Sequence, residues 1–374
     1  MTFKKYLVGG AVRDKQLKIQ SNDNDWVVVG TTPSTLLSLG YTQVGADFPV
    51  FLHPETNEEY ALARTERKNG HGYNGFETFF SPTVTLEEDL GRRDLTINAM
   101  AMDENGNITD PYNGMDDLHK KILRHVSESF ADDPLRILRV ARFSAKFPEF
   151  TIHNQTMDLM DRMVTNGTLQ EISGERILQE CLKSFSTESP YLFFEVLHQI
   201  RADEVAFGGS CNIQKIKKIM SATGYSELSD EWRLALAFSA SDLPISRLES
   251  TMIRQKWPKS LSQSLRLLMV VYPKINNIKN TSDYYEFCKQ ADAFRRNERF
   301  EEFVHAISLY HSFDKDALLS AVSAVNSTSL EEPLRDIPPH LKQQQAESIK
   351  QKIFASHLNI ALPIKKNQSP TLKQ

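Results

Sequence analysis

The chain contains few cysteines, and their spacing excludes two classes of small scaffold. Cys181, Cys211 and Cys288 are the three cysteines among its 374 residues, and no CxxC pair occurs. A cysteine-rich zinc module and a disulfide framework are therefore both excluded. The chain also lacks 18 consecutive apolar residues and an apolar leader at its start. We therefore expect a soluble, cytoplasmic protein.

An excess of positive charge is also missing. The 44 Lys and Arg residues face 48 Asp and Glu residues, which gives a formal net charge of −4. If such a protein binds nucleic acid, it must gather its positive side chains locally, because its overall field repels phosphates. The 40% hydrophobic and 25% charged residues are globular values that argue against wholesale disorder.

Two regions of different character follow each other along the chain. Apolar and β-branched runs bounded by turn residues predict strands in the first region, at 6–8, 26–29, 48–52 and 59–63. Beyond about residue 115 we find no convincing strand, and helical periodicity dominates. It is clearest over 133–147, 155–165, 175–186 and 190–200. We predict an α+β fold, in which a small mixed-sheet head is followed by an all-helical neck, body and tail.

The changes in character also predict the domain boundaries. We expect a head over residues 1–118 and a helical neck over 119–190. A helical body and tail should follow over 191–364. The last ten residues, 365–374, are polar and are predicted to be disordered.

The segment LVGGAVRD, residues 7–14, predicts a strand that ends at two glycines and leads directly into a helix. Glycines let the backbone approach a bulky anion, and the free N–H groups at a helix start favour phosphate. Arg13 would add a forked donor for phosphate oxygens. A plain strand–turn–helix is the alternative interpretation.

Asp23 and Asp25 precede the second predicted strand. Carboxylates at i and i+2 on a strand point to one face and repel each other unless a cation lies between them. Mg²⁺ prefers oxygen ligands, and paired carboxylates that bind metal recur in phosphoryl transfer. The same pattern also fits a solvated acidic turn or a glycosyltransferase that uses sugar nucleotides.

The stretch RRDLTINA, residues 92–99, places Asp94 and Asn98 at i and i+4, so we expect them to share a helix face. Asp94 is also adjacent to Arg93 and could orient it. Taken alone, the pattern favours an ordinary amphipathic helix with a surface ion pair, which contributes little stability.

A fourth motif combines the acidic residue Asp133 with three arginines that follow at steps of three, Arg136, Arg139 and Arg142. Pro134 suits the first helical position, which makes Asp133 a plausible N-cap. Because the rest of this predicted helix is apolar, we expect it to be buried, and its arginines then need anionic partners. A carboxylate and a guanidinium could also read the edge of a base. A helix cap followed by solvated arginines is the alternative.

In this order and spacing, the motifs resemble class II of the polymerase-β nucleotidyltransferase superfamily, and within it the bacterial tRNA CCA-adding enzymes. The resemblance is close through residue 145 and includes DPYNG at residues 110–114. SGERILQE, residues 173–180, resembles the helix-stabilising motif that follows in the family. Beyond about residue 190 the likeness is one of helical character alone.

The resemblance implies that the chain adds CCA to the 3′ end of tRNA from CTP and ATP, with Mg²⁺ as cofactor and pyrophosphate as the leaving product. Asp133 and Arg136 would then act as a protein template that pairs with the base, and the loop at 65–75 would help the change from C to A addition. The implied metal ligands and catalytic residues are Asp23 and Asp25. The implied nucleotide-binding residues are Gly10, Arg13, Arg93, Asp133, Arg136, Arg139 and Arg142.

The chain departs from the family pattern in three respects. The acid pair before the arginine helix is Asp132-Asp133 instead of Glu-Asp. A third metal-site carboxylate has no clear match, and Glu59 and Glu66 are unassigned candidates. None of the ten histidines is followed by aspartate, so we expect no His-Asp phosphohydrolase domain. The helical remainder is then expected to hold tRNA, with basic clusters at 215–218, 254–259 and 295–299.

Several alternatives stay open at this stage. A poly(A) polymerase and an enzyme that adds only CC or only A lie within the same family. A glycosyltransferase would leave GGAVRD and the arginine helix unexplained. A non-enzymatic RNA-binding protein on a decayed scaffold would not need the full ligand set.

Overall fold

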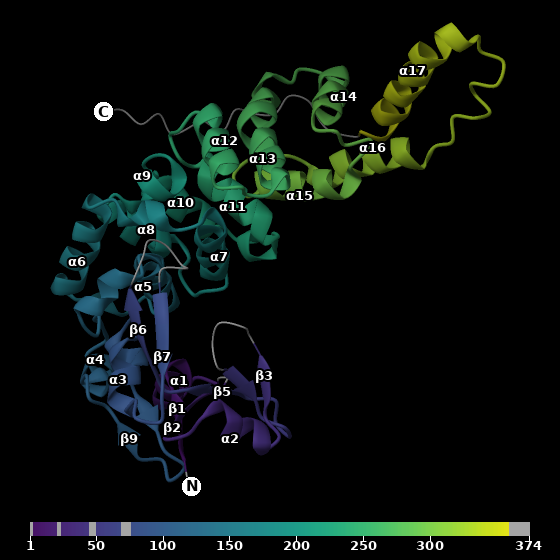
Figure 1. Cartoon of the computed structure of the whole chain (residues 1–374). Coiled ribbons are helices and arrows are strands. Elements are labelled where there is room, and N and C mark those ends of the chain that lie inside the picture. Colours follow the sequence, from purple (N-terminus) through teal and green to yellow (C-terminus); the bar gives the residue numbers. More distant parts are fainter. Residues whose placement is uncertain (1–2, 21–23, 45–49, 69–75, 359–374) are drawn as a thin grey trace. The chain divides into compact units, whose positions relative to one another are not determined.

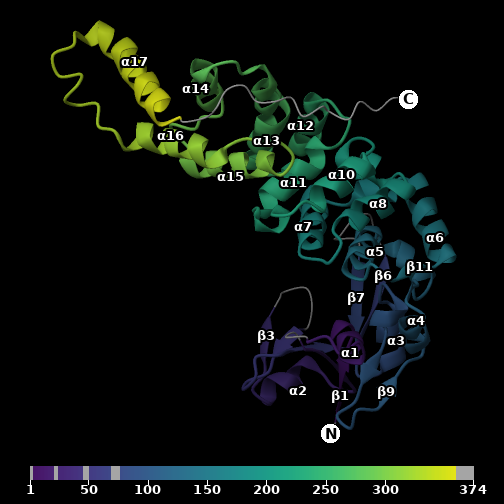
Figure 2. The same ribbon diagram turned by 180° about the vertical axis from the view of Figure 1, so that it is seen from behind.

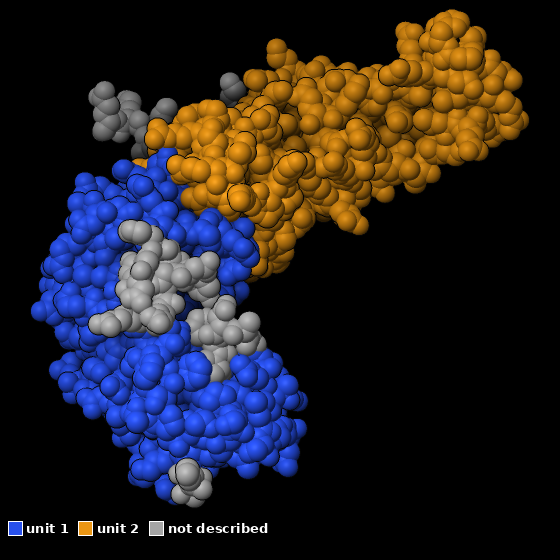
Figure 3. Space-filling model, in the orientation of Figure 1, with its two compact units in different colours: residues 1–209 blue, residues 210–374 orange. Residues whose placement is uncertain are grey.

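The computed structural model describes residues 3–20, 24–44, 50–68 and 76–358. The chain forms two compact units, residues 1–209 and 210–374 (Figure 3). Within the described residues, no helix is long and apolar enough to cross a membrane. The finer division into head, neck and body stays a prediction, and the predicted disordered segment 365–374 lies outside the described residues.

A seven-stranded mixed sheet forms the centre of the head, with the strand order β3-β4-β5-β2-β1-β8-β9 (Figure 1). β2 pairs antiparallel with β1 and parallel with β5. The middle of the sheet is apolar, and Val8, Val27 and Val28 are buried. The strands are β1 Lys4–Val8, β2 Asp25–Val29, β3 Thr42–Val44, β4 Val50–Leu52, β5 Glu59–Leu62, β8 Ala101–Met102 and β9 Ile108–Thr109.

Four further strands lie outside this sheet. β6 Arg64–Lys68 and β7 Phe76–Phe80 form an antiparallel pair. The predicted loop at 65–75 therefore begins as a strand, and its remainder from 69 lies outside the described residues. β10 Ile122–Leu123 and β11 Thr151–Ile152 form a parallel pair. The expectation of no strand beyond residue 115 was wrong here, because two-residue strands leave no alternating pattern to detect.

Helices α5 to α8 confirm the four helical segments predicted from periodicity, to within one or two residues at each end. The α+β order of sheet followed by helices is likewise confirmed. The α-helices of the first unit are α1 Gly10–Gln16, α2 Pro33–Ser38, α3 Leu86–Gly91, α4 Gly114–His119, α5 Leu135–Lys146, α6 Asn154–Thr165, α7 Gly174–Phe185, α8 Tyr191–Gln199 and α9 Ala202–Phe207. Short 3₁₀ helices occur at η2 Thr96–Asn98, η3 Glu128–Asp132 and η4 Thr168–Glu171.

Helix α5 connects the sheet to the helical part of the first unit. Its apolar side chains Ile137, Leu138 and Val140 are fully buried, and it packs against α7 and α8. Two opposite views place it between the head elements and α8 (Figures 1 and 2). Arg136, Arg139 and Arg142 of the same helix line a cavity, so a single helix contributes to both the core and the cavity wall.

The elements described in the second unit are all helical. Large aromatic side chains fill its core, and Trp232, Tyr284 and Phe300 are fully buried there. The α-helices are α10 Ile213–Met220, α11 Asp230–Ser239, α12 Ile245–Arg254, α13 Lys259–Arg266, α14 Thr281–Gln290, α15 Asn297–Ser308, α16 Lys315–Ser327 and α17 Pro339–His357. Shorter helical turns are η5 Tyr225–Glu227, η6 Leu267–Val271 and η7 Tyr272–Asn277.

The DPYNG segment, residues 110–114, leads from β9 into α4 and packs near the η2 turn. The Asp110 carboxylate accepts hydrogen bonds from the N–H groups of Gly114 at 2.7 Å and Met115 at 2.9 Å, which satisfies the start of α4. A Cβ atom on Gly114 would lie 2.2 Å from the carbonyl oxygen of Thr96 and 2.9 Å from Met100 Cγ. Glycine is therefore required at this position for α4 to rest directly on η2.

Replacing Gly114 by Ala should lower the free energy of unfolding by about 1–3 kcal/mol, because α4 or η2 must move to make room for the Cβ. Gly106→Ala is the control. Its Cβ would meet no atom within 4 Å, so only its left-handed backbone (φ 86°) carries a cost, about 1 kcal/mol. Urea denaturation followed by circular dichroism measures both. A Gly114 variant as stable as the original chain would contradict the close contact.

Candidate active site

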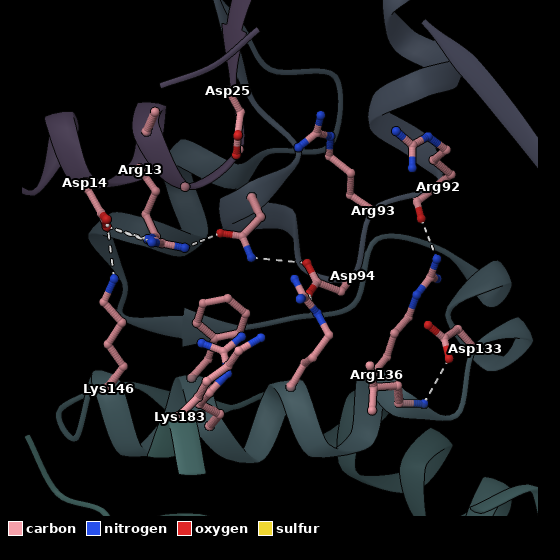
Figure 4. Close-up of a pocket in the computed structure, with 18 of the residues that line it drawn as sticks. Arg13, Asp14, Asp25, Arg92, Arg93, Asp94, Asp133, Arg136, Lys146 and Lys183 are labelled. Carbon is pink, nitrogen blue, oxygen red and sulfur yellow. Dashed lines mark hydrogen bonds and ion pairs between the residues drawn. The ribbon is translucent and has the colours of Figure 1, made fainter. Parts of the chain in front are cut away.

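A cavity of about 840 Å³ lies in the first unit, where the head faces α5 and α7 (Figure 4). Among the residues that the structure describes, ten Lys and Arg residues line it, against five Asp and Glu residues. An acidic chain thus gathers a strong local excess of positive charge, as its composition required of a phosphate-binding protein. The basic residues are Arg13, Arg64, Arg92, Arg93, Arg136, Arg139, Arg142, Lys146, Arg176 and Lys183, and the acidic ones are Asp14, Asp25, Glu66, Asp94 and Asp133.

Asp94 holds together the two walls of this cavity. Its side chain is buried and accepts hydrogen bonds from Asn98 Nδ2 at 3.1 Å, from the N–H of Leu95 at 2.9 Å and from Arg139 Nε at 2.7 Å. Asn98 in turn accepts a hydrogen bond from Arg13 Nη1. A continuous polar chain therefore runs from α1 through η2 to α5.

The surroundings of Asp94 keep it ionised. Burial acts to raise the pKa of Asp94, but the charge of Arg139 and the hydrogen bonds from Asn98 outweigh it and hold that pKa well below its usual range. Asp94 and Asn98 do come together as expected. The expected helix face is wrong, however, because η2 is a short 3₁₀ turn preceded by extended backbone at Leu95. The surface ion pair is excluded as well, since the Asp94 side chain is 5% exposed.

Arg13 is held on three sides. Its Nε and Nη2 atoms lie 2.8 and 2.7 Å from Asp14 Oδ1, and its guanidinium carbon lies 5.3 and 5.1 Å from the ring centres of Phe143 and Phe147. Lys146 Nζ reaches the other oxygen of Asp14 at 3.3 Å. Burial lowers the pKa of Arg13. Asp14 and Lys146 are thus site residues that sequence reasoning missed, although Asp14 ends the LVGGAVRD motif.

The partner predicted for Arg93 was wrong. Arg93 Nη2 donates to Asp89 Oδ2 at 3.3 Å, whereas Asp94 pairs with Arg139. Asp89 is fully buried and also accepts hydrogen bonds from Arg92 Nε at 3.1 Å and Nη2 at 2.9 Å. The spacing of Asp89 and Arg93 is i and i+4 across the end of α3, a helix-neighbour signal that could have identified this pair from the sequence.

Glycine in the first motif is favoured by the backbone conformation at Gly9, and an arginine side chain lies close to it. The backbone of Gly9 is left-handed (φ 68°), and a Cβ there would lie 2.7 Å from Arg93 Nη1. Arg93 therefore rests directly on the turn between β1 and α1. Among the described residues, no hydrogen-bond partner contacts the buried Nε of Arg93. A buried donor without a partner is costly, so it fits a ligand that supplies an anionic oxygen.

The charged residues of α5 each have a different internal partner. Arg136 is buried and donates to the carbonyl oxygens of Ser129 at 2.8 Å and Arg92 at 2.6 Å, and burial lowers its pKa. Arg142 Nε lies 2.6 Å from Glu180 Oε2 on α7. The expectation of a buried helix is therefore confirmed, and so is that of anionic partners for Arg139 and Arg142, whereas Arg136 donates to backbone carbonyl oxygens. α5 itself begins at Leu135, one residue after the expected Pro134.

Asp133 stands just before α5 and has two partners. Its Oδ1 accepts a hydrogen bond from the N–H of Leu135 at 3.1 Å, and its Oδ2 accepts one from Arg176 Nη2 at 3.2 Å. The Asp133 side chain thus accepts a hydrogen bond from a free N–H group at the start of α5, as a helix N-cap does. Arg176 and Glu180 lie in the SGERILQE segment, to which no cavity role was assigned from the sequence.

Of the nine site residues predicted from the sequence, eight line this one cavity, and the ninth, Asp23, lies outside the described residues. Asp25 is the first residue of β2, and its carboxylate faces the cavity (Figure 4). Carboxylate oxygen is the ligand type that Mg²⁺ prefers, so Asp25 fits a magnesium site. In the part of the chain that the structure describes, no three His, Cys, Asp or Glu residues are close enough to hold a metal.

The third metal carboxylate remains unassigned. Glu66 lines the cavity, but its Oε1 accepts hydrogen bonds from Arg64 Nε at 3.1 Å and from Arg92 Nη1 at 2.9 Å. The negative charge of Glu66 is thus already paired with Arg64 and Arg92 in the cavity wall. Glu59 is exposed at the start of β5.

Replacing Asp94 by Asn should lower the free energy of unfolding at pH 7 by about 2–3 kcal/mol. The Arg139 guanidinium would stay in the same position but without a carboxylate to neutralise its charge. This loss of stability is smaller than the loss expected for a fully buried ion pair, because the Arg139 side chain is 36% exposed. The folded-state pKa of Asp94 is depressed, so its stabilisation is complete above the unfolded-state value of about 3.9 and declines as the pH falls below it.

Urea denaturation at pH 7 and at about pH 3 tests this, and the difference between the two proteins should shrink at the lower pH. Asp116→Asn is the control, since Asp116 forms an exposed ion pair with Lys120 at 2.8 Å, worth less than about 1 kcal/mol. Equal losses in both variants would contradict the role of Asp94.

Two family models match the first unit. The model described as "Poly A polymerase head domain" matches residues 5–124, and the model described as "Probable RNA and SrmB- binding site of polymerase A" matches residues 149–205. The first covers the sheet, the β1–α1 turn and the Asp94 region. The second covers α6 to α8, including Arg176 and Glu180.

A solved CCA-adding enzyme in complex with ATP has the same fold over most of the chain. The TM-score is 0.72 at 21% identity, over 94% of this chain and 86% of that one. At this identity the likeness concerns the fold alone.

Relatives of higher sequence identity say more about the family of this chain than the likeness of fold does. A "Multifunctional CCA protein" of Vibrio parahaemolyticus is 61% identical over 199 residues, 53% of this chain and 49% of that protein. The chain thus spans about half the length of this relative. A "CCA-adding enzyme" of Coxiella burnetii is 42% identical over 339 residues, 88% of this chain and 89% of the other. An identity this high over nearly the full length of both proteins places the chain in the family of CCA-adding enzymes.

Proposed function

We propose that this chain adds C, C and A in turn to the 3′ end of tRNA, using CTP and ATP and releasing pyrophosphate. The observation that carries the proposal is the convergence of eight predicted site residues on one cavity with a large excess of positive charge. Such a cavity suits a triphosphate and an RNA end, which are both polyanions. Membership of the CCA-adding family supports the same activity.

The two ends of the cavity differ in chemistry, and this suggests how the nucleotide lies. Arg13 and Lys146 lie at one end and Asp133 with Arg136 at the other (Figure 4). The 12 residues of α5 span about 18 Å between these ends, comparable with an extended nucleoside triphosphate. We place the triphosphate at the end where Arg13 and Lys146 contribute positive charge, and the base at the end where the Asp133 carboxylate lies near the Arg136 guanidinium, because an acceptor near a donor can pair with the edge of a base.

The reaction forms one bond and breaks another at the α-phosphorus. The 3′-oxygen of the RNA attacks in line, and the bond to the bridging oxygen of pyrophosphate breaks. Arg93 and Arg139 stand where they can offset the charge on the phosphoryl oxygens, and both are held in place by buried carboxylates. Asp23 and Asp25 would hold Mg²⁺, which supplies Lewis-acid stabilisation in this class of reaction.

The parts of the chain then divide the work. We assign the chemistry to the head (1–118), the choice of nucleotide to the neck (119–190) and the grip on tRNA to the body and tail (191–364). In the second unit, Arg295, Arg296 and Arg299 all lie within 4 Å of Asp292, so positive charge outnumbers negative there. A surface of this kind suits an RNA backbone. A cytoplasmic location follows from a tRNA substrate.

Product lengths on tRNA that lacks its last three nucleotides test the proposal directly. CTP alone should extend the RNA by two nucleotides, ATP alone should extend it little, and both together should extend it by three. These outcomes follow if the base is chosen by side chains without a nucleic-acid template. Long tails from ATP alone would point instead to a poly(A) polymerase, and a product that stops at CC would point to a CC-only enzyme.

Replacing Asp25 by Asn should lower the rate of nucleotide addition by at least about 100-fold, because one anionic metal ligand is lost. Binding of tRNA, measured by filter retention, should change little. Asp103→Asn removes a carboxylate from an exposed turn that is not among the residues that line the active-site cavity, so its rate should match the original chain. Full activity in the Asp25 variant would refute the metal assignment.

A further inference from the structure

Helix α7 forms one ion pair with Asp133, just before α5, and one with Arg142 within α5, and the two pairs have opposite polarity. On α7, Arg176 contributes the cation that meets Asp133 at 3.2 Å, and Glu180 contributes the anion that meets Arg142 at 2.6 Å. Residues 176 and 180 are spaced i and i+4, so they share one face of α7. A single helix face therefore fixes both ends of the charged row along α5.

The first of these pairs determines how the Asp133 carboxylate is turned. One oxygen is bound by the N–H of Leu135 and the other by Arg176. The carboxylate cannot rotate without breaking one of these two hydrogen bonds. A carboxylate accepts about four hydrogen bonds in all, so room is left for a further donor from the cavity.

Orientation matters because the candidate bases differ, in both the exocyclic group and the ring nitrogen, along the edge that would face Asp133. Cytosine and adenine present an exocyclic amine beside a ring acceptor, whereas uracil and guanine present a carbonyl oxygen beside a ring N–H. A fixed carboxylate accepts from the amine and repels the carbonyl oxygen. A carboxylate that turns freely can move aside, and the repulsion that excludes the wrong base is then weakened.

We propose that Arg176 is a specificity-determining residue for the base of the incoming nucleotide, acting as a positioning residue through Asp133. The proposal rests on the proposed function, because it requires that Asp133 faces the base. Glu180 holds Arg142, further along α5 toward the end where Arg13 and Lys146 lie. All four nucleoside triphosphates are alike at that end, so Glu180 acts on each of them equally.

The contrast between the two α7 residues supplies the test. Arg176→Ala should lower the preference for CTP over UTP, measured as the ratio of kcat/KM values on tRNA lacking its terminus, by about tenfold. Glu180→Gln should lower kcat/KM for both nucleotides by a similar factor and leave the ratio unchanged. Added guanidinium ion should restore part of the preference in the Arg176→Ala variant. Arg176→Lys keeps the charge with a different donor geometry and should give an intermediate ratio.

The outcomes separate the inference from the function on which it rests. An original chain that shows no preference for CTP over UTP would refute both. An original chain that prefers CTP, with an unchanged ratio in Arg176→Ala, would refute the inference alone. Parallel shifts of the ratio in the Arg176 and Glu180 variants would also overturn it, because they would indicate a general loosening of α5 against α7. Should Arg176→Ala fail to fold, the ratio of Arg176→Lys decides in the same way.

Discussion

The arrangement of the site depends on one buried carboxylate. Asp94 contacts Arg139 directly and Arg13 through Asn98, so it joins the β1–α1 turn of the head to α5. Burial of an unpaired carboxylate would cost several kcal/mol, and the charge of Arg139 together with two N–H donors offsets that cost. The head and α5 are thereby fixed to each other at the depth of the cavity, where small displacements would matter most for a reacting phosphate.

The arginines of the cavity illustrate how a protein prepares a site for a polyanion. Each of Arg13, Arg93 and Arg142 is held by a carboxylate, so its direction is set before any substrate arrives. Burial lowers the pKa of Arg13 and of Arg93 despite the nearby carboxylates, as expected where desolvation of a charged guanidinium is not fully offset. An anionic ligand would complete that compensation, and little reorganisation would be needed when charge develops in the reaction.

Much of the fold was accessible from the sequence, because it rests on local patterns. Apolar spacing located α5 to α8, and the glycine pair located the β1–α1 turn. The partners of the arginines were less accessible. Arg142 and Glu180 are 38 residues apart, and such a pair leaves no local signature. Arg93 was matched with its neighbour Asp94, although adjacent residues seldom face each other and Asp89 at i−4 was the better choice. Very short strands such as β10 carry too few residues for any pattern.

The separation of these partners along the chain has a consequence for biosynthesis. The ion pair between Asp14 and Lys146 can form only after a further 132 residues have been synthesised. The ion pair between Arg142 and Glu180 can form only after α7 has been synthesised. A ribosome adds about 5–20 residues per second, so synthesis of the sheet, which ends at Thr109, precedes completion of α7 at Phe185 by roughly 4–15 s. During that interval Arg142 on α5 lacks the Glu180 carboxylate, and the ribosome nearby carries RNA with a high density of phosphates. Late arrival of α7 therefore sets the moment at which the nascent chain acquires a finished pocket.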